Sequence, residues 1–477
     1  MDSTDEGVTT ASDPAVRPAA TAAPARHRHD GWLLAAGAVA FGAALAAYLV
    51  YVKTHPRIDW MDAVDLRVYR DGGLIVRHIR PFYRASRPSP LYGWPGYQNL
   101  PFAYPPIAAM LFTAATLTSF WTLWKISVGV NIAALLATIW MTFGGLGYRR
   151  GLARLGATLL LAAPLFWTEP VQRTLYLGQI EIVQMTLIIW DQWQLDRRWW
   201  KGAGIGLAAG IGLTPLIFMP YLLLTRRFRQ AAVAVGTFAA TVLLGFAVLP
   251  RDSRKWWLDG VFFNGNRDGF IGWEGNQSLR AIITRFTGSV AAAEPTWLVV
   301  AALTAVVGLV CAALLDRAGH RVVGLLTCAL TGLLVSPISW DHAGVWIVPG
   351  TVAAAVYAVR ARRAAARWGA AGLAVAVTGI FGAWPGRLLG EPHDLGGFSK
   401  GLIWAPPNTN PEVYLRLGDL PRYVEYHWHG LQILAGNLYV LTGIALFALL
   451  VAWAAGASRS AGPGLLRAML APSRSEP

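Results

Sequence analysis

The chain of 477 residues is 55% hydrophobic and only 14% charged, with a mean hydropathy of +0.42. This composition excludes an ordinary soluble globular protein. The net charge of +15 does not predict a nucleic-acid partner, because the basic residues lie in short clusters between apolar runs and not in one patch. Such clusters are typical of the cytoplasmic ends of membrane spans. The sequence therefore predicts an all-α polytopic membrane protein.

The predicted chain order is a tail, a membrane domain and a second tail. Residues 1–30 are rich in Ala, Thr and Pro, which predicts a disordered cytoplasmic segment. Apolar runs of about 20 residues then recur between residues 31 and 456, each long enough to cross a bilayer as a helix. We expect about ten to twelve crossings and a cytoplasmic tail at 457–477. Three longer loops are predicted on the outer face, near residues 53–103, 251–285 and 385–432.

An acidic segment follows the first apolar run, and four carboxylates lie between Asp59 and Asp71. Carboxylates are costly beside a bilayer, so the cluster favours a site that faces water or a polar substrate. An amphipathic helix on the membrane surface is predicted over Val64–Arg77, with Asp62, Asp65 and Tyr69 on one face. One of these aspartates is a candidate general base for a sugar hydroxyl. The alternative is that the acids only form ion pairs, with Lys53, Arg67 and Arg70.

Polar residues interrupt several later apolar runs. Tyr104 lies among prolines at a predicted helix start, and Gln179 and Glu181 lie at the mouth of an apolar segment. Thr214 and Pro215 break another segment, so the bundle is expected to enclose a polar cavity. For Gln179 the alternative is a hydrogen bond between two helices.

Two compact polar clusters come later in the chain. Ser336-Pro-Ile-Ser-Trp-Asp-His342 lies at a predicted outer boundary, and His342 is a candidate donor to a phosphate oxygen. Gly275-Asn-Gln-Ser278 precedes Arg280, a pattern that suits amides binding hydroxyls and an arginine facing a phosphate. The alternatives are a structural histidine and an ordinary turn with an interface arginine.

Taken in order, these segments resemble glycosyltransferase family 87, membrane enzymes of actinobacteria that use polyprenyl-phosphate sugars. The resemblance implies a multi-span helical bundle of the type called GT-C. The resemblance covers roughly residues 60–345. Within the family, the chain is most similar to the α-1,2-mannosyltransferases of phosphatidylinositol mannoside and lipomannan synthesis. The matching pieces are Asp65-Leu-Arg-Val-Tyr69, Gly72-Gly73, Arg80-Pro-Phe-Tyr83, Pro101-Phe-Ala-Tyr-Pro-Pro106, Gly178-Gln179, Leu213-Thr-Pro215, Gly275-Asn-Gln-Ser278 and Ser336-Pro-Ile-Ser-Trp-Asp-His342.

The resemblance implies roles for particular residues. Asp65 is the expected catalytic base, with Asp62 as the second choice. The groups expected to bind the donor phosphate are His342, Arg280, Arg70 and Arg267. The groups expected to bind substrate are Tyr69, Tyr104, Gln179, Glu181, Asn276, Gln277, Trp340 and Asp341. No cofactor is expected beyond the lipid-linked sugar, although Asp62 and Asp65 leave room for a weakly held divalent metal.

The expected reaction moves mannose with inversion from polyprenyl phosphate to a glycolipid or lipoglycan hydroxyl, on the outer face of the plasma membrane. Three positions depart from the family pattern: Gly212 stands where a lysine is expected, Glu181 where an asparagine is, and Ala343 where a second histidine is. A lost cation and a gained anion indicate a different donor or acceptor. Two alternatives therefore stay open, an arabinofuranosyltransferase and a glycolipid transporter without chemistry.

Overall fold

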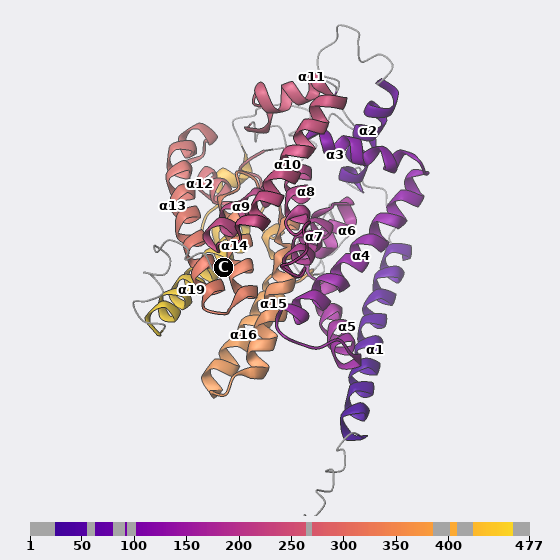
Figure 1. Cartoon of the computed structure of the whole chain (residues 1–477). Coiled ribbons are helices and arrows are strands. Elements are labelled where there is room, and N and C mark those ends of the chain that lie inside the picture. The colour runs from indigo at the N-terminus through magenta and orange to yellow at the C-terminus, as the bar shows by residue number, and fades with distance from the viewer. Residues whose placement is uncertain are drawn as a thin grey trace, which may run out of the picture.

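The computed structural model of the chain describes residues 24–54, 63–79, 91–92, 102–263, 270–384, 401–407 and 423–460. Within these ranges the regular elements are helices and no β-strand forms, which confirms the predicted all-α class (Figure 1). Among the described residues, six helices are long and apolar enough to cross a membrane, in agreement with a polytopic protein. They are Asp30–Thr54, Phe120–Gly145, Phe228–Val248, Val290–Arg317, Asp341–Arg360 and Leu438–Ala457.

Shorter apolar helices lie between these six, at Pro106–Thr116, Leu152–Phe166, Thr214–Leu224, Arg321–Val335 and Ala364–Ile380. Whether each of them crosses the bilayer is not decided by length, so the number of crossings stays a prediction. The first helix begins at Pro24, inside the stretch whose composition predicts disorder.

The helices of the first half are α1 (Pro24–Thr54), α2 (Val64–Ile79), α3 (Pro106–Leu111), α4 (Phe120–Gly145), α5 (Leu152–Phe166), α6 (Glu169–Leu177), α7 (Glu181–Gln192), α8 (Ala203–Ile211), α9 (Phe218–Leu224), α10 (Phe228–Val248) and α11 (Pro250–Ser253). Those of the second half are α12 (Leu279–Thr287), α13 (Val290–Arg317), α14 (Arg321–Val335), α15 (Ile347–Arg360), α16 (Ala364–Ile380), α18 (Leu431–Gly436) and α19 (Leu438–Ser460). A 3-10 helix, Asp341–Trp346, leads directly into α15.

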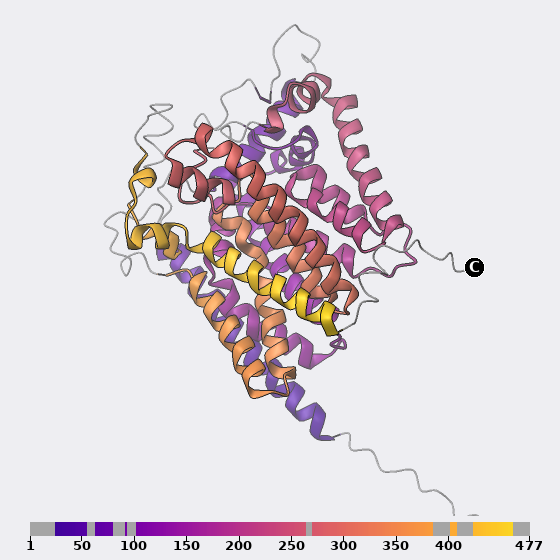
Figure 2. The same ribbon diagram turned by 90° about the vertical axis from the view of Figure 1, so that its left-hand side faces the viewer.

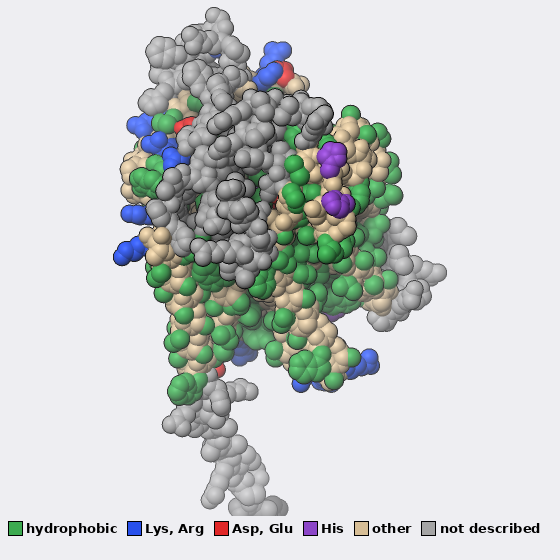
Figure 3. Space-filling view, turned by 180° about the vertical axis from the view of Figure 1, so that it is seen from behind, with side chains coloured by type: hydrophobic (Ala, Val, Ile, Leu, Met, Phe, Trp, Pro, Cys, Tyr) green, Lys and Arg blue, Asp and Glu red, His purple; other side chains and the backbone are tan. Residues whose placement is uncertain are grey.

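Pairs of neighbouring or stacked helices make the bundle. α1 packs along α5, α13 along α14, and α15 along α16, while α19 lies against α13 and α14 (Figure 2). Outward faces remain apolar: Leu303 and Val306 of α13 are 62% and 63% exposed. In Figure 3 hydrophobic side chains cover much of the middle of the visible face. Apolar residues on an outer surface are expected where lipid tails, and not water, are the solvent.

Helix α2 lies with α3 and α11 at one end of the molecule (Figure 1). It runs without a break through Gly72 and Gly73, although glycine weakens a helix. A Cβ at Gly72 would lie 2.5 Å from the Phe102 ring, and one at Gly73 would lie 2.3 Å from the Phe112 carbonyl oxygen. The two glycines therefore let the chain around α3 pack directly on α2. A helix is thus present where the acidic segment predicts one; its place on a membrane surface stays a prediction.

Candidate active site

Asp65 lies in the first turn of α2, and α2 is attached at its start to the end of α6. The backbone N–H of Ala63 donates to the Tyr176 carbonyl oxygen at 2.9 Å. The Asp65 Oδ2 accepts a hydrogen bond of 2.7 Å from Gln179 Nε2. Burial raises the pKa of the Asp65 carboxyl from its ordinary 3.8 to about 6, although nearby His342 acts in the opposite direction. The carboxyl is therefore held in place and titrates close to neutral pH.

Gln179 joins three of the predicted site residues. Its Oε1 accepts from the Tyr69 hydroxyl and, at 3.2 Å, from the Tyr104 hydroxyl. The two hydroxyl oxygens are themselves 2.8 Å apart. Asn131 Nδ2 donates to the Gln179 backbone carbonyl at 3.1 Å, which fixes the main chain as well. Both ends of the Gln179 amide are thus occupied, and its N–H side is directed at Asp65.

Gly178 allows this approach between α2 and the α6–α7 connection. It ends α6 in the left-handed conformation, with φ of 75°, where residues with a Cβ are disfavoured. A Cβ at Gly178 would also lie 2.5 Å from the Cβ of Leu66. Any side chain here would push α2, and with it Asp65, away from Gln179.

Gly178→Ala is therefore expected to destabilise the protein by about 2–5 kcal/mol, from left-handed strain plus overlap with Leu66. Gly147→Ala is the matched control, because Gly147 also has a positive φ, 87°, and open space around it. The control should lose only the strain, about 1–2 kcal/mol. Denaturant titration of the two purified variants measures the difference. Equal losses in both would show that contact with Leu66 is unimportant.

A second group of charges centres on His342. Its Nε2 lies 3.4 Å from Glu181 Oε1, and its Nδ1 lies 3.1 Å from Asp341 Oδ1. Asp341 Oδ2 accepts from Arg173 Nε at 3.0 Å. Arg173 Nε is also 3.9 Å from Glu169 Oε1. Acids and bases therefore alternate along one row of buried side chains, with the imidazole held between two carboxylates.

The Trp-Asp-His segment is held by the loop that contains Asn276. Asn276 and Trp340 form an isolated antiparallel β-bridge, and the backbone N–H of Asp341 donates to the Gly275 carbonyl at 2.8 Å. Asn276 Oδ1 accepts from the Ser339 backbone N–H at 3.0 Å. The loop of residues 275–278 and the Trp-Asp-His segment are thus one structural unit that positions His342.

The amides of this loop bond to the protein backbone. Asn276 Nδ2 donates to the Ile271 carbonyl at 3.0 Å. Gln277 Nε2 donates to the Gly436 carbonyl at 2.9 Å, and its Oε1 accepts from the Val440 N–H at 3.1 Å. The binding of substrate hydroxyls by these two amides stays a prediction. Their contacts in the structure position the loop against α19.

The Asp65 and His342 groups belong to one site. Glu181 follows Gln179 by two residues and connects the groups, since it contacts His342 while its charge acts on Asp65. The pKa of Asp65 also responds to His342 and Arg173. The structure therefore brings together most of the residues that the sequence singles out, namely Asp65, Tyr69, Tyr104, Gln179, Glu181, Trp340, Asp341 and His342.

Comparison with known proteins identifies the chain. The model of "Glycosyltransferase family 87" matches residues 102–337. A protein of Mycobacterium tuberculosis named polyprenol-phosphate-mannose-dependent alpha-(1-2)-phosphatidylinositol pentamannoside mannosyltransferase is 35% identical over 353 residues, which is 72% of this chain and 75% of that protein. The chain belongs to glycosyltransferase family 87. It is a membrane glycosyltransferase.

Two further relatives have similar names. A phosphatidylinositol mannoside mannosyltransferase of M. tuberculosis, also polyprenol-phosphate-mannose-dependent and alpha-(1-2), is 30% identical over 70% of this chain and 77% of that protein. A pentamannoside mannosyltransferase of Mycolicibacterium smegmatis is 32% identical over 64% of this chain and 74% of that protein. No solved structure matches the chain. The family match itself contains Gln179 and Glu181 but neither Asp65 nor His342.

Not every predicted residue of this glycosyltransferase joins the site. Arg280, expected beside a donor phosphate, forms a 2.7 Å ion pair with Glu294 of α13 and stacks on the Trp297 ring at 4.8 Å. The Nε of Arg70 is buried and has no hydrogen-bond partner among the residues that the structure describes. Asp62 and Arg267 lie outside the described residues. The phosphate-binding roles of the three arginines stay predictions.

Sequence reasoning missed Arg173 and Glu169. Both are buried in α6, all nine residues of which are buried, from Glu169 to Leu177. Charged side chains spaced four residues apart in an apolar chain are a usable signal, because a buried charge normally needs a partner. Trp404 was missed too; its Nε1 donates to Glu169 Oε1 at 3.1 Å.

A metal site is not apparent in the described part of this glycosyltransferase, where no group of three His, Cys, Asp or Glu side chains has the arrangement of a metal site. No metal is expected from the sequence, and Asp62, which with Asp65 leaves room for a weakly held ion, lies outside that part. Metal dependence therefore stays untested.

Proposed function

We propose that this glycosyltransferase moves mannose from a polyprenyl-phosphate donor to a hydroxyl group of a glycolipid acceptor, forming an α-1,2 linkage. The named activity of three relatives supports mannose and the polyprenyl donor. The same names support a phosphatidylinositol mannoside as the acceptor. The observation that carries the proposal is Asp65, a carboxyl fixed by Gln179 with a pKa near 6.

In the proposed reaction Asp65 accepts the proton of the acceptor hydroxyl while that oxygen attacks the anomeric carbon of mannose. The bond from the anomeric carbon to the phosphate oxygen breaks, and its electron pair leaves with polyprenyl phosphate. Direct displacement of a β-linked donor gives an α-linked product, with inversion at one carbon. Fixing the base and both reactants in line lowers the entropic part of the barrier.

Among the described residues, His342 is the base best placed to stabilise the departing phosphate. It contacts Glu181, and so it lies at the end of the row of buried charges that is nearest to Asp65. Arg173 is already paired with Asp341, so it orients the row. The described cluster holds four carboxylates, Asp65, Glu169, Glu181 and Asp341, against these two bases. Burial raises the pKa of Glu169 well above its ordinary value. A further cation from Arg70 or Arg267 is consistent with the predicted roles.

The proposed location is the plasma membrane, with the site on the outer face and both termini in the cytoplasm. Supporting this, the basic clusters Arg149-Arg150, Arg226-Arg227 and Arg360 with Arg362-Arg363 follow or precede apolar helices on the expected inner side. Labelling of single cysteines introduced at Asp259 and Arg362 in intact cells tests this orientation. Reaction of the Asp259 position with an impermeant reagent, without reaction at Arg362, is the expected result.

Incubating the purified protein in vesicles with labelled polyprenyl-phosphate mannose and a phosphatidylinositol mannoside tests the function. A new glycolipid whose mass is higher by one hexose, and whose added linkage is α-1,2, is expected. Competing mannose and arabinofuranose donors in one reaction show which sugar is used. Uptake of the glycolipid into the vesicles without a new product would contradict the proposed transfer reaction and favour a transporter.

The transfer rate is expected to rise as the pH increases through about 6. The sign follows from the role: below its pKa Asp65 is protonated and has no lone pair free for the acceptor proton, and above it the carboxylate is present. The acidic limb of the kcat/KM profile measures this pKa in the free enzyme. Gln179→Leu removes a hydrogen bond that lowers the Asp65 pKa, so the limb should move to higher pH. A limb that stays in place in this variant would contradict the assignment.

A further inference from the structure

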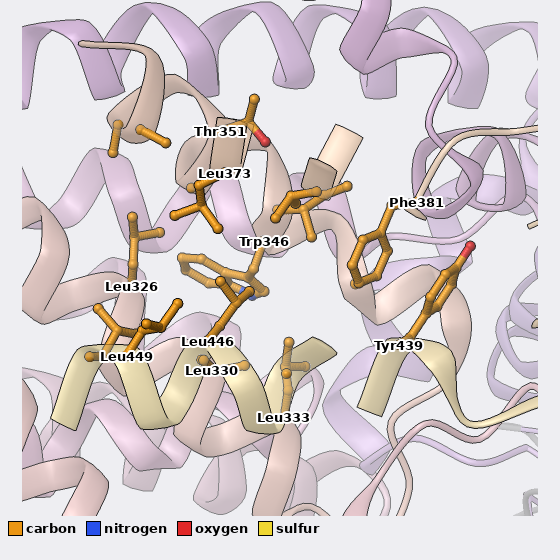
Figure 4. Close-up of a pocket in the computed structure, with 18 of the residues that line it drawn as sticks. Leu326, Leu330, Leu333, Trp346, Thr351, Leu373, Phe381, Tyr439, Leu446 and Leu449 are labelled. Atoms are coloured by element: carbon orange, nitrogen blue, oxygen red, sulfur yellow. The ribbon is translucent and has the colours of Figure 1, made fainter. Parts of the chain in front are cut away.

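An elongated cavity of about 370 Å³ lies between α14, α15, α16 and α19, and this volume is within the range of small-molecule sites. Its walls are almost entirely apolar. Figure 4 shows Leu330, Trp346, Leu373, Leu446 and Leu449 around the open space. The reaction of Asp65 with a sugar hydroxyl does not use this space.

The cavity is long. On the Asp341–Arg360 segment its lining runs from Asp341 to Tyr357, and on α19 from Tyr439 to Trp453. At 1.5 Å of rise per helical residue these spans are roughly 24 Å and 21 Å, most of a hydrocarbon core of about 30 Å. A space of this modest volume that extends so far suits a single hydrocarbon chain better than a compact head group.

One end of the cavity is polar and lies at the active site. Asp341, Ser339 and Gln277 line it there, and His342 is the residue next to Asp341. Away from this end the lining is mainly apolar, with the hydroxyl-bearing Thr351, Tyr357 and Tyr439 as exceptions. It includes several residues with little or no side chain, namely Gly344, Gly350, Ala353, Ala354, Ala370, Ala374 and Gly443. Among the glycines, Gly350 faces open space, since a Cβ there would meet no atom within 4 Å.

We expect a lipid chain to reach the cavity between α16 and α19. α16 packs mainly against α15 and touches α19 only slightly, and the two helices diverge in Figure 2. Both contribute to the lining, through Ala370, Leu373 and Ala374 on one side and Leu446 and Leu449 on the other. A chain lying in the bilayer is therefore able to enter sideways while its head group stays near Asp341.

We propose that this cavity binds the isoprenoid chain of the polyprenyl-phosphate donor, an inference that rests on the proposed function. The choice of the donor follows from how far each lipid chain lies from the reacting atoms. The donor's hydrocarbon begins directly after the phosphate that leaves the anomeric carbon, whereas the acyl chains of a glycolipid acceptor are separated from the reacting hydroxyl by sugar rings. Asp341 lines the cavity, and its Oδ1 lies 3.1 Å from His342 Nδ1, so the donor chain starts nearer to the cavity than the acyl chains of the acceptor do.

Filling the cavity tests the proposal. A Cβ at Gly350 would meet no atom within 4 Å, so Gly350→Phe places a ring in the open space without displacing the backbone. Gly372→Phe is the matched control, because Gly372 of α16 also has no atom within 4 Å of a Cβ and is not part of the lining. The measurement is kcat/KM for mannosyl donors with a long polyprenyl chain and with a chain of two isoprene units.

The wild-type protein and Gly372→Phe are expected to prefer the long-chain donor. In Gly350→Phe this preference should fall by about tenfold or more, since loss of contact with only two methylene groups already corresponds to that factor. An unchanged preference in Gly350→Phe would overturn the proposal. So would a changed preference among acceptors of different acyl length with the donor preference intact, because the occupant would then be the acceptor's chain.

Photolabelling provides a readout that does not depend on transfer or on the folding of a variant. A polyprenyl phosphate with a diazirine in one of the isoprene units nearest the phosphate should label peptides of α14, α15, α16 or α19 in the wild-type protein. Labels confined to other helices would overturn the cavity assignment even when mannose is transferred. Failure of the wild-type protein to transfer mannose from any donor would instead overturn the proposed function, whichever peptides are labelled.

Discussion

Asp65→Asn is expected to lower the rate of mannose transfer by about 10²–10⁴-fold, the usual contribution of a positioned general base. Asparagine is nearly the same shape as aspartate, and its Oδ1 retains the ability to accept the 2.7 Å hydrogen bond from Gln179. The local structure should therefore survive while the proton acceptor is lost. Binding of the donor, measured separately with labelled lipid, should change little.

Asp259→Asn is the control for the loss of one carboxylate. Asp259 is 44% exposed at its side chain and forms only a 3.5 Å surface pair with Lys255, so its variant should transfer mannose at the native rate. The acidic limb of the pH profile should also disappear from the residual activity of Asp65→Asn, because the group that produces it is gone. Transfer at near-native rate by Asp65→Asn would assign the base elsewhere.

The helical class and the location of the site were predictable because each rests on a local property of the sequence. Runs of apolar residues specify spans, and the costly acids before Asp71 pointed to the first loop. The structure places Asp65 and Tyr69 on the same side of α2, where both contact Gln179, as the spacing of four predicts. Their meeting with Gln179, more than one hundred positions later, was implied by the resemblance and not by any periodicity.

The partner of a polar side chain was much harder to predict than its presence near the site. The amide of Gln277 has the same donors and acceptors whether it binds a sugar hydroxyl or the backbone of Gly436, and no spacing rule separates the two. Arg280 illustrates the same difficulty, since its ion pair with Glu294 spans a turn between two helices. Such contacts depend on tertiary packing, which a linear pattern does not contain.

Arg173 was overlooked although the structure makes it central. It lies between recognisable motifs, and its importance arises only when α6 packs against the 3-10 helix that contains Asp341. The guanidinium then lies 4.9 Å from the centroid of the Trp404 ring, which belongs to a third segment. Arg173 thus connects three parts of the chain, and that connection makes its removal the most disruptive substitution that we expect for stability.

Arg173→Met is expected to lower the free energy of unfolding by about 3–5 kcal/mol, the effect of removing one partner from a buried ion pair. Arg173 is only 8% exposed and donates to Asp341 at 3.0 Å. Methionine keeps the apolar stem, but it leaves Asp341 as a buried charge with no cation except His342. Arg198→Met is the control, since Arg198 is exposed and only stacks on the Trp200 ring at 4.8 Å, and it should change stability by less than about 0.5 kcal/mol.

The double variant Arg173→Met, Asp341→Asn separates the charge from the packing of the side chain. If the loss comes from an uncompensated carboxylate, neutralising Asp341 should return a large part of the stability, and the two substitutions will not be additive. Denaturant titrations of the four proteins in one detergent give the coupling energy. Additive losses would mean that Arg173 stabilises the site by its contacts with Trp404 and not by its charge.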